Sequence, residues 1–293
     1  MRVLITGCHG QVGSCLAEQL ASNEDTAVLA LDREHLDITS QDAVNAVVGE
    51  FLPTIIINAA AHTAVDKAEK EVELSYAINR DGPKYLAQAA QSVGAAILHI
   101  STDYVFDGNK VGEYSETDAT NPQGVYGESK LAGEVAVAEE CDQHIILRTA
   151  WVFGENGNNF VKTMLRLANT HDSLNVVGDQ FGGPTYAGDI ASTLIQIAEC
   201  ITRGDTVEYG VYHYSGLPHV SWFDFANTIF DIAVEQGALE SKPGLTSITT
   251  DQYPTPAKRP SNSRLSTEKI TLGFPVEASD WKAALNNIRA HIG

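Results

Sequence analysis

The stretch VLITGCHGQVG at residues 3–13 decides the fold class of this chain. It begins as an apolar run typical of a buried strand and continues with Gly7, Gly10 and Gly13. Residues 11–21 then repeat apolar side chains with helical periodicity. A strand, a glycine-rich turn and a helix in this order predict a nucleotide-binding unit. The glycines allow close backbone approach to a pyrophosphate, and the helix N-terminus favours its charge.

Strand and helix patterns continue to alternate through the first half of the chain. We expect strands at 27–31, 54–60, 95–101 and 144–149, and helices at 41–51, 71–92 and 126–139. Such alternation predicts a parallel sheet with right-handed crossovers. The fold class is therefore α/β, a doubly wound parallel sheet of the Rossmann type.

The second half is less regular and predicts a smaller C-terminal α/β lobe. We expect helices at 159–168, 188–201, 221–237, 266–270 and 280–292, and strands at 174–177 and 211–214. Ser221 has the side chain of a helix N-cap. We predict a dinucleotide-binding domain over residues 1–155, with later returns to its sheet, and a substrate lobe mainly over 156–293.

Composition restricts the function classes. The 293-residue chain carries a formal net charge of -19, which disfavours binding to nucleic acid. No stretch reaches the roughly 18 apolar residues that a membrane helix needs, and we predict no membrane association. The four cysteines have neither zinc-ligand nor disulfide spacing, so we expect reduced thiols and a cytoplasmic location.

An acidic and a basic residue follow the second predicted strand. Asp32 stands where a carboxylate accepts hydrogen bonds from the adenosine ribose and favours NAD. Arg33 follows it and suits the 2′-phosphate of NADP. The choice between NADH and NADPH therefore stays open.

Three polar residues predict the reaction chemistry. Thr102 follows the fourth strand, where ligands of open α/β sheets bind. Tyr126 and Lys130 are one helical turn apart in YGESK, so phenol and ammonium share a helix face. A nearby cation is expected to lower the pKa of Tyr126, which then gives its proton to a carbonyl that receives a hydride. Thr102 is expected to bind the same oxygen.

Seven stretches carry a resemblance to a known family. They are INAAAHTAVDKAE (57–69), STDYVFDG (101–108), VYGESKLAGE (125–134), RTAWVFG (148–154), NNFVKTMLRLA (158–168), DQFGGPTYAGDIA (179–191) and YPTPAKRPSNSRL (253–265). Together with the motifs above, they resemble the extended short-chain dehydrogenase/reductase family, in its branch of deoxysugar-nucleotide reductases.

The resemblance implies NADPH- or NADH-dependent reduction of the C4 ketone of dTDP-4-dehydro-β-L-rhamnose, a dTDP-sugar. Tyr126 would be the proton donor, with Lys130 on the nicotinamide ribose and Thr102 at the carbonyl. It implies that Asp103 lies along the sugar, that Trp151 packs on its ring and that Arg259 grips the pyrophosphate. The residues implied to line the cofactor are Gly10, Gln11, Val12, Asp32, Asp37, Ile38, Ala61, His62 and Thr63.

Metal binding and assembly follow the family less closely. Some relatives dimerise through Mg²⁺ held by carboxylates, one of them on the first helix. Cys15 stands two residues after Gly13 in this chain, and a thiol is a poor ligand for Mg²⁺. We therefore predict no metal site, even though Asp189 could retain one carboxylate of that arrangement. A homodimer is left open.

Two other functions remain open at this stage. One is a reductase or epimerase of another deoxysugar nucleotide, because epimerases share the fold and retain NAD⁺. The other is a non-catalytic regulatory subunit of the kind that partners methionine adenosyltransferase.

Overall fold

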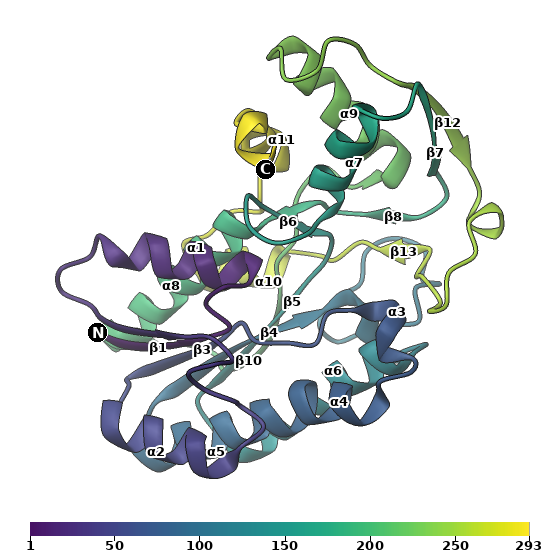
Figure 1. Ribbon diagram of the computed structural model, residues 1–293. Helices are drawn as coiled ribbons and strands as arrows, with labels where there is room; N and C mark the ends of the chain where they lie inside the picture. The colour runs from purple at the N-terminus through teal and green to yellow at the C-terminus, as the bar shows by residue number, and fades with distance from the viewer. Residues whose placement is uncertain (293) are drawn as a thin grey trace.

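Six parallel strands form the main sheet, in the order β10-β5-β4-β3-β1-β2 (Figure 1). The computed structural model describes residues 1–292. The strands are β1 (Arg2–Thr6), β2 (Ala27–Leu31), β3 (Ile55–Asn58), β4 (Ala96–Thr102), β5 (His144–Thr149) and β10 (Gly210–His213). Strand order reverses at β1, which has β2 on one side and β3 on the other. Ligands of doubly wound sheets bind at the carboxyl ends of the strands beside such a reversal.

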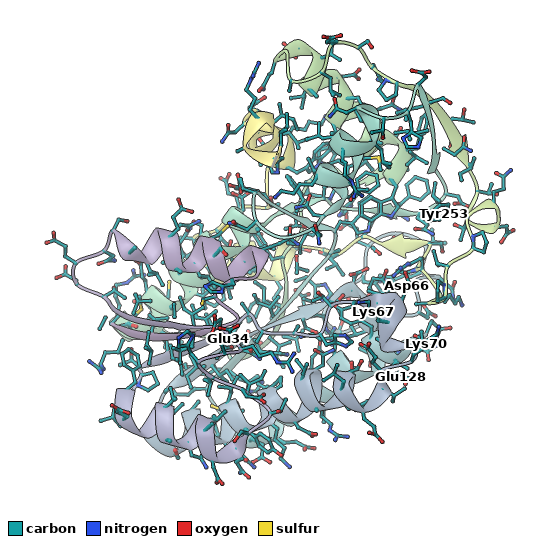
Figure 2. All side chains as sticks on the ribbon, in the orientation of Figure 1. Glu34, Asp66, Lys67, Lys70, Glu128 and Tyr253 are labelled. Carbon is teal, nitrogen blue, oxygen red and sulfur yellow. The ribbon has the colours of Figure 1, made fainter. Side chains whose placement is uncertain are left out.

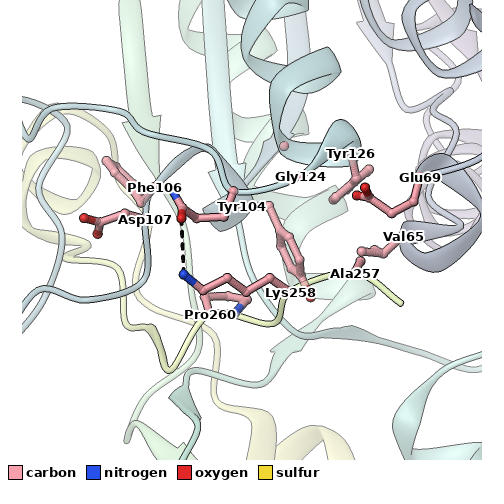
Figure 3. A pocket seen from close by; sticks show the side chains of 12 residues that line it. Val65, Glu69, Tyr104, Phe106, Asp107, Gly124, Tyr126, Ala257, Lys258 and Pro260 are labelled. Carbon is pink, nitrogen blue, oxygen red and sulfur yellow. Dashed lines mark hydrogen bonds between the residues drawn. The ribbon is translucent and has the colours of Figure 1, made fainter. Parts of the chain in front are cut away.

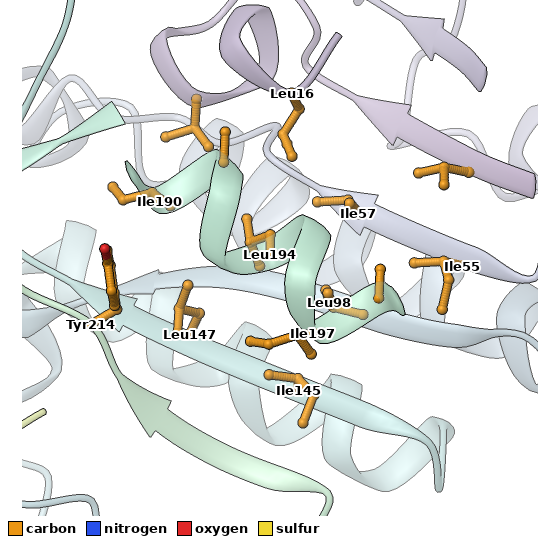
Figure 4. Packing of buried hydrophobic residues seen from close by; sticks show 14 of the residues in the cluster. Leu16, Ile55, Ile57, Leu98, Ile145, Leu147, Ile190, Leu194, Ile197 and Tyr214 are labelled. Atoms are coloured by element: carbon orange, nitrogen blue, oxygen red, sulfur yellow. The ribbon is translucent and has the colours of Figure 1, made fainter. Parts of the chain in front are cut away.

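Helices cover both faces of this sheet (Figure 1). On one face lie α1 (Gln11–Ala21) and α8 (Ala187–Arg203), and on the other α2 (Gln41–Phe51), α5 (Gly82–Val93) and α6 (Val125–Glu140). Ile190, Leu194 and Ile197 of α8 point onto apolar strand residues in Figure 4. Burial on both faces explains why the strand sequences are continuously apolar.

The long helix expected at 71–92 contains a change of helix type. It consists of α4 (Val72–Tyr76), a π-helical turn (Ala77–Asp81) and α5, and it ends at Gly94, whose φ is 70°. The π turn carries the buried Asn79, which donates to Ser129 of α6 at 3.0 Å. A Cβ on Gly133 would lie 2.0 Å from the Asn79 carbonyl oxygen, so glycine permits this close helix contact. Periodicity cannot reveal the extra residue of a π turn, because the apolar face continues through it.

The second lobe has its own core, in which Phe153, Phe225, Phe230 and Trp281 are fully buried. Its helices are α7 (Phe160–Ala168), α9 (Trp222–Glu235) and α11 (Trp281–Leu285), and α10 (Glu268–Gly273) packs on β10. The short strands are β6 (Val152–Phe153), β7 (Ser173–Val177), β8 (Phe181–Gly182), β9 (Thr185–Tyr186), β11 (Val220–Ser221), β12 (Gly244–Ile248) and β13 (Asn262–Ser263). One further helix, α3 (Val65–Ala68), and 3₁₀ turns at Asp103–Val105, Thr250–Gln252 and Ile288–His291 complete the elements.

The predicted fold class is confirmed, and most predicted elements agree within two residues. Ser221 caps α9 through a reciprocal capping box with Asp224. The helix expected at 280–292 is wrong as one element, because α11 ends at Leu285 before a 3₁₀ turn. Strand β10 and helix α8 return to the main sheet, and the boundary near residue 155 stays a prediction. None of the helices in residues 1–292 has the length and apolar character needed to cross a membrane.

Candidate active site

The glycine turn between β1 and α1 is sterically restricted to glycine. Gly7 has a φ of 73°, and a Cβ there would lie 2.7 Å from the Ala60 nitrogen. A Cβ on Gly13 would lie 2.1 Å from the Gly7 carbonyl oxygen. Within residues 1–292, no side chain caps α1 at Gly10. The first N–H groups of the helix are therefore available to an anion, as dinucleotide binding requires.

A groove of about 540 Å³ opens beside this turn. Its size is within the usual range of ligand pockets, roughly 300–1,000 Å³. Eight of the predicted cofactor residues line it, namely Gly7, Gly10, Asp32, Arg33, Asp37, Ile38, Ala61 and His62. The groove also has an apolar wall that the sequence did not reveal, formed by Leu36, Leu74, Ala77 and Ile78. An apolar wall beside hydrogen-bond acceptors suits an adenosine.

Asp32 is held in place at the rim of the groove. Its Oδ1 accepts from the backbone nitrogens of Glu34 and His35, both at 3.0 Å, and lies 2.6 Å from His35 Nδ1. The hydrogen bond with the His35 side chain is the main cause that lowers the pKa of Asp32. Its Oδ2 lies 3.2 Å from the exposed His9 ring. The carboxylate is therefore ionised and oriented at neutral pH, beside the exposed Arg33.

Six predicted cofactor residues do not line the groove, and two of them, Tyr126 and Lys130, belong to the cluster at the end of β4 described below. Gln11 accepts at Oε1 from Asn159 Nδ2 at 3.0 Å and so links α1 to the start of α7. The side chain of Val12 belongs to the hydrophobic core. Gly13 acts through packing, as described above, and Thr63 is exposed beyond the groove.

His62 makes several contacts with the chain around it. Its backbone nitrogen donates to Asn79 Oδ1 at 2.8 Å, and its Nδ1 lies 2.9 Å from Ser75 Oγ. Its Nε2 is 3.2 Å from Glu71. Ring contacts to Ser75 and Glu71 leave His62 as a wall of the groove rather than a reactive base.

Thr102 and Tyr126 come together beyond the carboxyl end of β4. Thr102 Oγ1 donates to Asp103 Oδ1 at 3.1 Å and accepts from the Tyr104 nitrogen at 3.2 Å. Tyr126 lies beside this turn, because its ring packs against that of Tyr104. Lys130 is 2% exposed and donates from Nζ to the Ile100 carbonyl oxygen at 2.6 Å. The three predicted catalytic side chains therefore lie around one end of β4.

The expected effect of the cation on Tyr126 is wrong for this structure. Burial raises the pKa of the Tyr126 phenol, and only the interaction with Thr102 acts to lower it. Burial also lowers the pKa of Lys130 to about 8, so the protonated fraction of this lysine falls already at mildly alkaline pH. Desolvation is the largest effect on both groups, and the negative charge of Asp103 further raises the pKa of Tyr126.

Asp103 is a buried carboxyl group directly beside the phenol. It is 4% exposed, and burial raises its pKa to about 6, against the opposing influence of the nearby Ser263 and Thr102 side chains. Its Oδ2 has no hydrogen-bond partner within residues 1–292. Ser263 comes from β13, far along the chain, and no local sequence signal pointed to it. An unsatisfied buried oxygen is poised for a ligand donor.

Arg259 connects the two lobes beside Tyr126. Its NH2 donates to Asp66 Oδ2 at 2.6 Å and its NH1 to the Tyr104 hydroxyl at 3.2 Å. Figure 2 shows Asp66 below Tyr253 of the second lobe. Tyr104 packs edge-on against Tyr126, with ring centroids 5.3 Å apart, in the pocket of Figure 3. The pocket wall opposite includes Ala257, Lys258 and Pro260.

Trp151 lies at the junction of the lobes in an unusual backbone conformation. Its φ is 51°, in a region that residues other than glycine rarely adopt. Its indole stacks on Trp222, with ring centroids 3.5 Å apart and an interplanar angle of 10°. A Cβ on Gly182 would lie 2.6 Å from this indole. The predicted contact between Trp151 and a sugar ring stays a prediction.

Cys15 and Asp189, the two positions compared with the metal ligands of relatives, both make contacts within the fold. Cys15 is 6% exposed, and burial raises its pKa to about 11. Asp189 accepts from Ser279 Oγ at 2.6 Å, and burial raises its pKa. Within residues 1–292, no group of three or more His, Cys, Asp or Glu is arranged to hold a metal ion.

A doubly wound sheet, a glycine turn beside a groove, and Thr102, Tyr126 and Lys130 at the end of β4 define an extended short-chain dehydrogenase/reductase. The family described as RmlD substrate binding domain matches residues 1–292, and the chain belongs to it.

Individual relatives match along nearly the whole chain. The dTDP-4-dehydrorhamnose reductase of Aggregatibacter actinomycetemcomitans is 57% identical, over 99% of this chain and 99% of that protein. A crystal structure of a dTDP-4-dehydrorhamnose reductase from Clostridium acetobutylicum has a TM-score of 0.89 and 43% identity, over 99% and 98% of the two chains. The Bacillus anthracis enzyme, solved in complex with NADP, has a TM-score of 0.90 and 39% identity, over 98% of each chain.

Proposed function

We propose that this protein reduces the C4 ketone of dTDP-4-dehydro-β-L-rhamnose to dTDP-β-L-rhamnose, with NADPH or NADH as the reductant. The observation that carries the proposal is the convergence of Thr102, Tyr126 and Lys130 at the carboxyl end of β4, the sheet edge that also holds the dinucleotide groove. The full-length similarity to reductases with this activity supports the choice of substrate.

In this reaction, the bound cofactor supplies the hydride for C4. Tyr126 donates its phenolic proton to the carbonyl oxygen as negative charge develops there. Thr102 donates a hydrogen bond to the same oxygen, for which it must release Asp103 Oδ1. Lys130 holds the nicotinamide ribose, and its charge stabilises the phenolate that remains.

Residues from both lobes are proposed to hold the sugar nucleotide. The unpartnered Asp103 Oδ2 accepts a sugar hydroxyl. Trp151 packs on the sugar ring at the lobe junction. Arg259 grips the pyrophosphate, for which its guanidinium must exchange Asp66 for phosphate oxygens. In this proposal, cofactor binding belongs to residues 1–155, whereas the sugar nucleotide contacts both Asp103 and Trp151 of that part and Arg259 of residues 156–293.

The cofactor choice follows from two neighbouring side chains. Asp32 offers acceptors to a ribose diol, and Arg33 is free to contact a 2′-phosphate. We propose that both NADH and NADPH bind. Titration of the protein with each cofactor, followed by nicotinamide fluorescence, measures the preference.

Cofactor oxidation with enzymatically prepared dTDP-4-dehydrorhamnose tests the proposed reaction. We expect loss of the NADPH absorbance and formation of dTDP-rhamnose, identified by NMR. Binding of NADPH without turnover would contradict the reductase. Turnover of another 4-keto deoxysugar nucleotide at a higher kcat/KM would change the substrate but keep the reaction class.

A further inference from the structure

Three buried polar residues stand side by side across the main sheet. Thr6 of β1 is in register with Asn58 of β3, and Asn58 is in register with His99 of β4. Their exposed fractions are 1%, 0% and 0%. The preceding residues on this face, such as Ile56 and Ile97, belong to the apolar core. Polar groups in such a place must satisfy one another.

The direction of the hydrogen bonds in this row is determined by a backbone group. The Ala60 nitrogen donates to Asn58 Oδ1 at 3.1 Å, and a backbone N–H cannot act as an acceptor. Thr6 Oγ1 donates to the same oxygen at 2.7 Å. The Asn58 amide nitrogen therefore faces His99 Nδ1, at 3.0 Å, and must donate to it.

This order decides the tautomer of His99. Because Nδ1 accepts a hydrogen bond, a neutral imidazole carries its hydrogen on Nε2. Protonation of Nδ1 would place two donors against each other, and burial already lowers the pKa of His99 well below its usual value. His99 is therefore neutral, with its Nε2–H directed away from Asn58.

The Nε2 of His99 lies 3.4 Å from Lys130 Nζ. A neutral amine has a lone pair that accepts the Nε2–H, whereas an ammonium has none. The charged lysine would thus face a donor at this position, although it still donates to the Ile100 carbonyl oxygen at 2.6 Å. The row of residues opposes the charged form of the very lysine proposed to bind the cofactor.

We propose that Thr6, Asn58 and His99 form a positioning relay that fixes His99 as the Nε2–H tautomer and directs that hydrogen at the Lys130 amine. The relay controls where the amine lies and how readily it takes a proton. It begins directly before Gly7 of the cofactor turn and ends at the proposed ribose-binding lysine. Its importance for catalysis rests on the proposed function, but its hydrogen-bond order does not.

Other charged groups near Lys130 act alongside the relay. Glu134, one turn further along α6, acts to raise the pKa of Lys130, and Arg148 of β5 pairs with that carboxylate at 2.6 Å. Tyr126 lies one turn earlier on α6, and Asp103 lies beside its phenol. Burial outweighs Glu134 and lowers the pKa of Lys130 to about 8. Lys130 is therefore near the midpoint of its titration at mildly alkaline pH, where a change in the direction of the His99 hydrogen measurably alters its protonation.

Proton–nitrogen NMR of the ligand-free protein with isotope-labelled histidine tests the tautomer without any turnover. His99→Phe identifies the signal by its loss. We expect a protonated Nε2 and a bare Nδ1 across the neutral pH range. A protonated Nδ1, or an imidazolium that titrates in this range, would overturn the relay. Failure of the protein to reduce the sugar nucleotide would sink the proposed function and leave this result standing.

A second experiment reverses the direction of the hydrogen bonds in the relay. A carboxylate in Asn58→Asp accepts from His99, which moves the imidazole hydrogen to Nδ1 and makes Nε2 an acceptor for Lys130. The Lys130 midpoint, followed by carbon NMR of labelled lysine and assigned with Lys130→Met, should then rise by about one pH unit or more.

The same Asn58→Asp change in a His99→Phe background is the matched control. It keeps the new carboxylate but removes the imidazole that connects it to Lys130, so most of the rise should disappear. An equal rise in both backgrounds would show that the carboxylate acts through space, and would overturn the relay. The tautomer measurement on the wild-type protein decides the question if a variant does not fold.

Discussion

Replacement of Tyr126 by phenylalanine tests the proposed proton donor. The change removes one hydroxyl and keeps the half-buried ring with its edge-on contact to Tyr104. Thr102 keeps its bonds to Asp103 at 3.1 Å and to the Tyr104 nitrogen at 3.2 Å, so the fold should survive. Loss of a general acid lowers turnover by roughly 10²–10⁴-fold. A hundredfold loss corresponds to about 2.7 kcal/mol of transition-state stabilisation.

The assay compares kcat, from NADPH oxidation with dTDP-4-dehydrorhamnose, and cofactor affinity, from fluorescence titration. We expect kcat to fall at least about a hundredfold while the NADPH affinity is nearly unchanged. Tyr104→Phe is the matched control, because it removes a neighbouring phenol that accepts from Arg259 at 3.2 Å. It should change KM for the sugar nucleotide more than kcat. A near-normal kcat for Tyr126→Phe would refute the proton-donor role.

Three further predictions follow from burial and close packing. Asp103→Asn should stabilise the protein at pH 7 by about 2–3 kcal/mol while lowering turnover, because the pKa of Asp103 is raised to about 6 and ionising the buried carboxyl destabilises the native state as pH rises from about 4 to 6. An equal melting temperature of the two proteins at pH 7 would contradict this prediction. Lys130→Met should stabilise the ligand-free protein at pH 7 by up to about 3 kcal/mol and weaken cofactor binding, because the pKa of Lys130 is lowered to about 8. Thermal melts should show that the stability difference between the variant and the wild type shrinks as pH rises from 8 to 10.5. Gly13→Ala should abolish cofactor binding in titrations, because its Cβ would lie 2.1 Å from the Gly7 carbonyl oxygen. Gly49→Ala is the control for a helical glycine and should bind the cofactor normally, since a Cβ there would have nothing within 4 Å; equal binding by both variants would contradict the steric argument.

The sheet and its order of elements were predictable because their signals are local. A strand buried on both faces is continuously apolar, and a glycine turn followed by helical periodicity is read within a dozen residues. The two-residue strands β8, β11 and β13 gave no such signal. They pair with segments far along the chain, as Asn262 does with Phe181, and only the folded lobe brings these together.

The types of residue in the site were determined by the sequence alone. Thr102 at a strand end, Tyr126 and Lys130 one helical turn apart, and glycines after the first strand are properties of local order. The tertiary structure decided their electrostatics. Burial by distant segments raises the pKa of Tyr126 and lowers that of Lys130, opposite to what a simple pair of neighbours suggests. Desolvation depends on every group packed around a side chain, and no local stretch of sequence contains that information.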